Sequence, residues 1–243
     1  MTSQTDVQKA PSNINANTVV SFLLASFFIV FLSFLLASVH GFVGWILVAV
    51  TLVILCFVLR YTKLTRADVG LSRRSIRSGI IVGLAFALIC AVGMTVAYVF
   101  MPSLFSDQRY EKTTQEIVWL LFVHIPLHTV LLEEFLFRGF IYGYAKNKKG
   151  HFFASIYSSL LFGLWHIGSS ADLFNSSDTV QNTLGSQASS GVLVGAGIVA
   201  ATTAAGMVFC YVRNKSGSLV APMLLHWGIN ATAAYLAYLA TRS

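Results

Sequence analysis

Charged residues are scarce in this sequence. Asp, Glu, Lys and Arg make up 10% of its 243 residues, whereas hydrophobic residues make up 56%. A soluble domain of average composition carries about a quarter charged residues, so the deficit excludes an ordinary soluble domain. The apolar residues also lie in runs of roughly 20, the length that crosses the hydrocarbon layer of a bilayer. Alternating ten-residue strands are not seen, which argues against an outer-membrane barrel. The composition therefore predicts an all-α, multi-pass membrane protein.

Several catalytic motifs are missing as well. The three cysteines, Cys56, Cys90 and Cys210, all lie in apolar runs and form no CxxC pair, which indicates buried, reduced thiols. There is no GxSxG, no HExxH and no Asp within an apolar run. These absences exclude a rhomboid serine protease, a site-2 metalloprotease and a presenilin-type aspartyl protease.

The apolar runs predict a transmembrane helical bundle of about seven spans, with an eighth as the alternative. The expected spans cover residues 18–38, 42–59, 79–101, 117–142, 152–168, 191–212 and 219–240. Residues 1–17 are polar and predict a disordered tail without the cleavage site of a signal peptide. A single membrane-embedded domain, 18–242, follows, and its motifs lie within 117–240. The polar loop 169–190 predicts a flexible connector, with a substrate-contacting lid as the alternative.

The positive charges indicate the orientation. The net charge is +7, but the Lys and Arg residues lie mainly in short loops between apolar runs, so we expect no nucleic-acid partner. Twelve of the 16 lie on one side of the expected spans, three on the other side, and Arg138 within a span. The positive-inside rule then predicts a cytoplasmic N-terminus and an outer C-terminus. We expect a protein of the plasma membrane, in a bacterium.

Against this apolar background, the stretch LLEEFLFRGF (131–140) places three charges inside an expected span. A charge at the bilayer centre costs roughly 2.5–3.5 kcal/mol on insertion scales, so such residues usually face a bundle interior and carry function. On a helix, Glu134 and Arg138 are i,i+4 neighbours and predict an ion pair. Glu133 is rotated by about 100° and has no such partner in its own helix. It is therefore the better candidate for a general base.

Two later helices supply possible partners for Glu133. Phe162 and His166 are one turn apart on the fifth expected span, and His226 and Asn230 are one turn apart on the seventh. From the helical rise, Glu133 lies ~16 Å from the nearest expected cytoplasmic loop, His166 ~22 Å and His226 ~14 Å. The depths overlap, so we expect these side chains to meet near the middle of the membrane.

These patterns resemble the motifs of the CAAX-protease and bacteriocin-processing family of intramembrane proteases. The family's motifs EExxxR, FxxxH and HxxxN stand in order at Glu133, Glu134, Arg138, Phe162, His166, His226 and Asn230. One such motif alone is common by chance, whereas three in order on separate helices are specific. The segment ADVGL (67–71) extends the resemblance weakly toward the N-terminal half.

The resemblance implies an intramembrane endopeptidase that cuts a membrane-associated protein or peptide near the membrane surface. Eukaryotic relatives remove the last three residues of prenylated CAAX proteins. By analogy, Glu133 and His166 would activate the attacking water, His226 and Asn230 would stabilise the oxyanion, and Arg138 would orient Glu134. No cofactor is required by this scheme. Relatives have been described both as glutamate proteases and as metalloproteases, so a zinc ion is the alternative.

Other residues near the motifs have two interpretations. His124 and His128 have the i,i+4 spacing of a zinc-binding pair, but Pro126 between them disturbs the helix, so packing is the simpler interpretation. Trp165 and Trp227, each beside a motif histidine, are expected to be cavity walls or packing residues, with substrate contact as the alternative.

A non-proteolytic membrane scaffold or regulator is the alternative function. A degenerate relative in that role is expected to lose a motif glutamate or histidine. This chain keeps every motif residue, which favours the protease.

Overall fold

The structure is a computed structural model that describes residues 16–39, 41–168 and 188–242. Every element in these ranges is helical, which confirms the all-α prediction. The expected tail 1–17 and loop 169–190 lie almost wholly outside the described residues. The long helices are α1 (Ala16–Ala37), α2 (Gly41–Tyr61), α3 (Ile76–Phe100), α6 (Tyr142–Trp165), α9 (Ala188–Ser216) and α10 (Val220–Ala240). Short 3-10 turns, η1 (Arg73–Ser75), η2 (Pro102–Phe105) and η3 (Gln108–Tyr110), flank α3 and lead to the fourth span.

Residues 114–149 form one continuous helical rod, called the central rod below. It consists of α4 (Thr114–Trp119), η4 (Leu120–Val130), α5 (Leu131–Glu134), η5 (Phe135–Ile141) and the start of α6. A capping box between Thr113 and Glu116 begins the rod. Gly150, with a φ of 83° that favours glycine, ends it, and the rest of α6 follows this break.

The central rod is longer than the span expected at 117–142, where a loop was predicted to follow. The segment 143–149, GYAKNKK, contains Ala and Lys residues that favour helix and no proline, so the helix continues. Gly143 also lets this part of the rod approach the chain before α3. A Cβ at Gly143 would lie only 2.9 Å from the Asp68 carbonyl oxygen.

Two parts of the central rod are wound more widely than an α-helix. η4 and η5 are π-helical, and the Leu131 N–H at the end of η4 donates to the carbonyl of Pro126, five residues earlier. Pro126 has no N–H and cannot make its own α-helical bond, so the predicted disturbance of the helix takes this form. The one α-helical turn between them, α5, carries Glu133 and Glu134. π-helical turns are frequent at functional sites.

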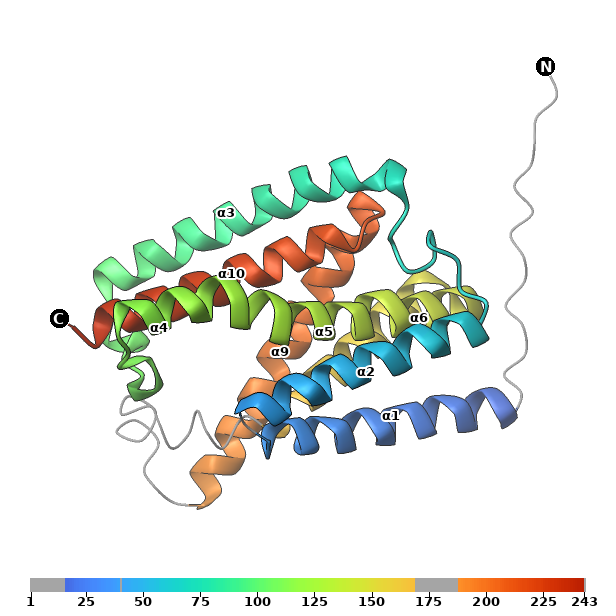
Figure 1. Ribbon diagram of the computed structural model, residues 1–243, viewed down its shortest axis with the longest axis horizontal. Helices are drawn as coiled ribbons and strands as arrows, with labels where there is room; N and C mark the ends of the chain where they lie inside the picture. The colour runs from blue at the N-terminus through green and yellow to red at the C-terminus, as the bar shows by residue number, and fades with distance from the viewer. Residues whose placement is uncertain (1–15, 40, 169–187, 243) are drawn as a thin grey trace.

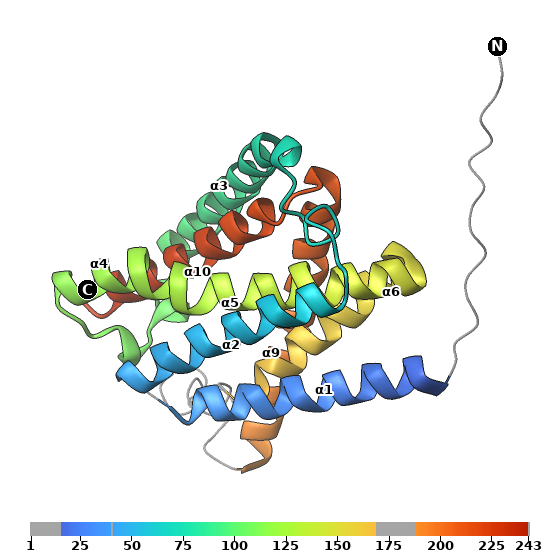
Figure 2. The same cartoon turned by 45° about the vertical axis from the view of Figure 1, so that its right-hand side comes forward.

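The helices form a bundle that α9 crosses. α1, α2, the central rod, α10 and α3 run roughly along the long axis of the molecule, while α9 passes behind them at a steep angle (Figure 1). In both views α3 lies beside α10 (Figure 2), the pair with the most extensive contact. Small residues make this close approach possible. A Cβ at Gly83 would lie 2.7 Å from the Ala221 carbonyl oxygen, and one at Gly228 2.7 Å from the Ala87 Cβ.

By length and apolarity, four helical stretches in the described part of the chain qualify as membrane spans, namely Gly41–Tyr61, Arg73–Phe100, Thr114–Trp165 and Gly191–Ser216. The third is 52 residues long and covers the expected span 117–142 and most of the expected span 152–168, one on each side of Gly150. These apolar helices support an integral membrane protein. The number of seven spans and the cytoplasmic N-terminus stay predictions.

The segment between α2 and α3, which contains ADVGL, is fixed to the end of the bundle that the charges predict to be cytoplasmic. Arg213 of α9 donates to the Asp68 carbonyl at 2.8 Å, and the Leu219 N–H donates to the Gly70 carbonyl at 2.8 Å. Gly70 has a φ of 79°, and a Cβ there would lie 2.5 Å from the Arg213 guanidinium carbon. The glycine thus allows a turn that tethers this segment to α9 and α10.

Candidate active site

Glu134 and Arg138 form a fully buried ion pair in the central rod. Arg138 Nη1 donates to Glu134 Oε1 at 3.0 Å, and both side chains are 0% exposed. The i,i+4 spacing predicts this pair, and the structure contains it. His226 of α10 donates from Nδ1 to the same oxygen at 2.8 Å. Because Nδ1 carries this proton, Nε2 is the nitrogen that a neutral His226 leaves free.

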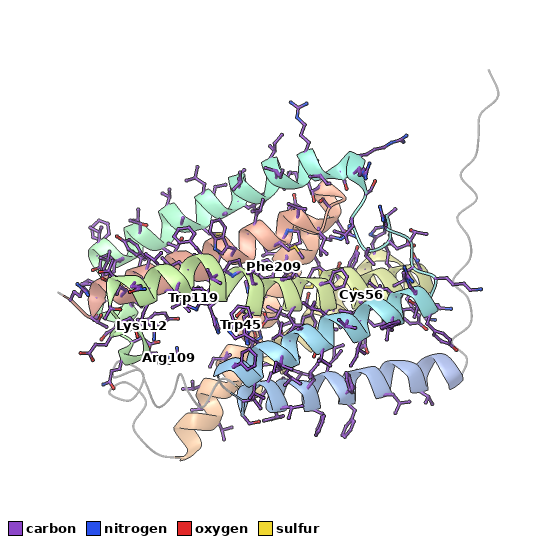
Figure 3. The ribbon with its side chains drawn as sticks, viewed as in Figure 1. Trp45, Cys56, Arg109, Lys112, Trp119 and Phe209 are labelled. Carbon is purple, nitrogen blue, oxygen red and sulfur yellow. The ribbon has the colours of Figure 1, made fainter. Side chains whose placement is uncertain are left out.

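Aromatic rings enclose the guanidinium of Arg138. Its central carbon lies 4.0 Å from the ring centre of Phe162 and 4.8 Å from that of Phe209. Phe209 of α9, which lies near the middle of the bundle (Figure 3), also stacks on His226 at 4.9 Å. Arg138 Nε and Nη2 have no hydrogen-bond partner among the described residues, so the ring faces are the attractive surroundings for this part of the charge. Gly206 leaves the space, because a Cβ there would lie 3.1 Å from Nη2.

Glu133 lies beside this cluster and has two different carboxylate oxygens. Oε1 accepts a hydrogen bond from the indole N–H of Trp165 at 3.0 Å. Oε2 is buried, and in the described part of the chain it has no hydrogen-bond partner. It lies 3.8 Å from His226 Nε2. That distance is too long for a direct hydrogen bond and suits a shared water or substrate atom.

His166 contacts Phe162, which in turn contacts other residues of the cluster. Its Nδ1 donates to the Phe162 carbonyl at 2.7 Å, at the end of α6, and its ring meets the edge of the Phe162 ring at 4.6 Å. The ring centre of Phe162 lies 5.8 Å from that of His226. The phenylalanine of the FxxxH motif therefore contacts both histidines and the Arg138 guanidinium.

Asn230 lies one turn after His226 on α10. Its side chain is partly buried and makes no hydrogen bond to the described residues. The structure thus brings Glu133, Glu134, Arg138 and His226 together directly. It attaches His166 through an aromatic contact, and the Asn230 amide has no hydrogen bond to the described residues.

The other histidine pair of the central rod packs against α2. The rings of His124 and His128 stack at 4.5 Å and meet the ring of Trp45 at 5.7 and 5.1 Å. Trp45 lies between α2 and the central rod (Figure 3). These contacts agree with the interpretation as packing residues.

A catalytic zinc ion usually has three protein ligands, together with a water. No group of three His, Cys, Asp or Glu side chains is placed to hold a metal ion within the described ranges. In the cluster itself, Glu134 Oε1 and His226 Nδ1 already bond to each other. The residues that are described here therefore do not fit a zinc ion.

Two residues of this cluster were not predicted to take part in it. Phe209 lies in the apolar segment GMVFCYVRN of α9, where the sequence carries no signal that separates it from other packing residues. Trp165 precedes a motif histidine, and this position is the only hint that its N–H points to Glu133.

A helical membrane protein with a buried cluster of carboxylates and imidazoles is the class that the fold and site define. Residues 114–232 match the family model described as type II CAAX prenyl endopeptidase Rce1-like. This match confirms the resemblance that the motifs predict: the segment that carries them belongs to the CAAX-protease family, which indicates an intramembrane endopeptidase of the CAAX type. The match begins after the ADVGL segment and does not include it. Comparison with curated proteins and with solved structures finds no match.

Proposed function

We propose that the protein cleaves a peptide bond of a membrane protein or membrane-bound peptide, with Glu133 as the general base that activates water. The observation that carries the proposal is the position of Glu133 Oε2, which is buried, unpaired among the described residues and 3.8 Å from His226 Nε2. A buried carboxylate oxygen without a donor is costly, so this site favours a water molecule or a substrate group.

In the proposed reaction a water bound between Glu133 Oε2 and His226 Nε2 gives one proton to Glu133. Its oxygen then bonds to the carbon of the scissile carbonyl, and the electron pair of the C=O bond moves to the carbonyl oxygen. When this tetrahedral intermediate collapses, the C–N bond breaks and the proton on Glu133 passes to the leaving nitrogen. Glu133 thus acts first as base and then as acid.

Glu134 and Arg138 position His226 in this scheme. The carboxylate of Glu134 accepts the Nδ1–H of His226 and so directs Nε2 toward Glu133. Arg138 balances the negative charge of Glu134, and both side chains are fully buried. Asn230, one turn away with an amide free of hydrogen bonds to described residues, is the proposed donor to the oxyanion. His166, whose ring contacts Phe162, contributes in this scheme to the binding of the water or the substrate.

No step of this scheme passes through a metal ion, because the described side chains do not provide three ligands. The metal content of the purified protein and its activity in a strong zinc chelator test this part of the proposal. We expect substoichiometric zinc and unchanged cleavage. Stoichiometric zinc together with loss of cleavage in the chelator would replace the glutamate mechanism by a metal-assisted one.

The central experiment compares wild type with Glu133→Gln and with Glu111→Gln as the matched control, because Glu111 is exposed in the link before the central rod. Each purified protein is incubated with a library of membrane peptides in lipid vesicles, and products are identified by mass spectrometry. We expect Glu133→Gln to slow cleavage about 10²–10⁴-fold, the range for loss of a general base, and Glu111→Gln to leave it unchanged. Equal cleavage by all three would refute the role of Glu133. If none cleaves and Glu133→Gln still replaces wild type in cells, the scaffold function is favoured.

A further inference from the structure

Two tryptophans lie next to motif histidines, and their indole N–H groups have different partners. Trp227, which follows His226, donates to the backbone carbonyl of Leu121 at 2.8 Å and so joins α10 to η4. Trp165, which precedes His166, donates to Glu133 Oε1 at 3.0 Å. The first bond connects two helices, whereas the second ends on the carboxylate that the proposed function uses as a base.

The bond from Trp165 determines how the Glu133 carboxylate is oriented. The last side-chain torsion of a glutamate is broad and roughly two-fold when nothing restrains it. Among the described residues, Trp165 is the one hydrogen-bond donor to Glu133. With Oε1 held by the indole, Oε2 is the oxygen left to face His226 Nε2, 3.8 Å away. Without the indole, nothing described here distinguishes the two oxygens.

Trp165 is itself rigidly held. Its side chain is 8% exposed, and its ring meets the edge of the Phe137 ring at 5.6 Å. Phe137 belongs to the central rod four residues after Glu133, so donor and acceptor are fixed to the same part of the bundle. A buried donor with only two side-chain torsions loses little entropy when it orients a neighbour.

We propose that Trp165 is a positioning residue of the hydrolytic site: its indole N–H fixes the Glu133 carboxylate so that one oxygen is held and the other is presented to the water. This inference rests on the proposed function of Glu133. It adds a residue outside the three motifs, and it assigns the function to the N–H group of the ring rather than to its size.

The test compares Trp165→Phe with Trp227→Phe, since each substitution removes one indole N–H and keeps an aromatic ring. With a cleaved peptide from the library, we expect Trp165→Phe to lower kcat about 10- to 100-fold at nearly unchanged KM, because a misplaced catalytic group costs of that order. Trp227→Phe is expected to keep the kcat of wild type. Thermal unfolding in detergent is measured for both, and both are expected to lose some stability, since each loses one hydrogen bond.

A second variant separates the N–H from the packing. In Trp165→His the imidazole Nε2 has the same ring position relative to Cγ as the indole nitrogen, so an N–H donor is retained while most of the packing volume is lost. The proposal predicts a higher kcat for Trp165→His than for Trp165→Phe, although the histidine variant should be the less stable. The opposite order of kcat, or equal kcat in Trp165→Phe and Trp227→Phe while Glu133→Gln is inactive, would refute the positioning role alone. Full cleavage by Glu133→Gln would refute the proposed function itself.

Discussion

The central rod carries two pairs of ionisable side chains at the same i,i+4 spacing, and their surroundings differ. Glu134 and Arg138 are fully buried and bond to each other at 3.0 Å, and His226 of α10 adds a second bond to Glu134. His124 and His128 are stacked at 4.5 Å and meet the ring edge of Trp45, and His128 also bonds to the backbone of Gly44. Both pairs thus have the same i,i+4 spacing, so the spacing alone does not determine whether a pair belongs to the candidate active site.

The difference comes from the other helices. α6, α9 and α10 supply Phe162, Phe209 and His226 to the first pair, so that its charges are bonded or covered by ring faces. α2 supplies one tryptophan and a backbone group of Gly44 to the second pair. A charged side chain within the membrane is tolerated when neighbouring helices supply an opposite charge or hydrogen-bond partners. Burying such a pair still costs desolvation free energy. The two pairs thus differ in whether another helix contributes a polar side chain, as α10 does with His226.

The largest effect that tests this comparison is expected from Arg138→Met. The substitution keeps a long side chain but leaves the buried Glu134 without its ion-pair partner, which costs about 3–5 kcal/mol in comparable buried pairs. We expect a loss of stability of this size, measured by unfolding in mixed detergent micelles, and loss of cleavage.

The double substitution Glu134→Leu with Arg138→Met is the control for this prediction. It removes both charges, so it should be more stable than Arg138→Met alone, and it should still be inactive because His226 loses its acceptor. A double variant less stable than the single one would show that the destabilisation comes from lost packing and not from an uncompensated charge.

A much smaller effect is expected when the histidine pair is replaced. His124→Phe and His128→Phe keep an aromatic ring against Trp45, and volume-conserving exchanges of this kind usually cost less than about 1.5 kcal/mol. We expect cleavage close to that of wild type. Zinc content, measured in wild type and both variants, checks the alternative. If a stoichiometric zinc ion and the activity disappeared together in either variant, the two pairs would be equally functional and the contrast would be wrong.

Much of the fold can be read from local patterns in the sequence. The apolar runs predict helices, and the i,i+4 spacing predicts the ion pair of Glu134 and Arg138. Helical rise alone put Glu133 and His226 at similar depth, and the structure has them 3.8 Å apart. One local expectation was wrong. A loop was expected at 143–149, but the central rod continues through this segment because its Ala and Lys residues favour helix.

Contacts between helices could not be predicted in this way. His226 bonds to Glu134 and only approaches Glu133, because the rotation of α10 decides which of two adjacent carboxylates it meets. Trp165 and Phe209 complete the site from helices far apart in the sequence, and each looks like an ordinary packing residue in its own segment. Side chains of this kind are recognised only once the packing of α6 and α9 on the central rod is known. The catalytic roles of the motif residues stay predictions.

A partly buried pair at the end of the central rod gives the smallest expected effect and completes the comparison. Lys146, near the end of the central rod, lies 3.8 Å from Asp68 in the segment between α2 and α3. Partial burial acts to raise the pKa of Asp68, but hydrogen bonds from Thr65, aided by the charge of Lys146, hold it below its ordinary value. The carboxylate therefore contributes stability above the pKa that it has in the unfolded chain, and this contribution is lost as the pH falls through the lower pKa of the folded state.

Asp68→Asn should accordingly lower the free energy of unfolding at pH 7 by about 0.2–1 kcal/mol, as expected for a pair near the surface. The unfolding temperature should fall slightly as a result. The difference between wild type and variant should shrink as the pH falls through the lowered pKa of Asp68 in the folded state, because the carboxylate then becomes protonated in both states. The bond from Arg213 to the backbone carbonyl of this residue is unaffected by the substitution, so the segment stays attached to α9. A stability difference that is as large at pH 3 as at pH 7 would show that the charge of Asp68 is not its source. If Asp68→Asn lost as much stability at pH 7 as Arg138→Met, the partly buried pair of Lys146 and Asp68 would not differ from the fully buried pair of Glu134 and Arg138.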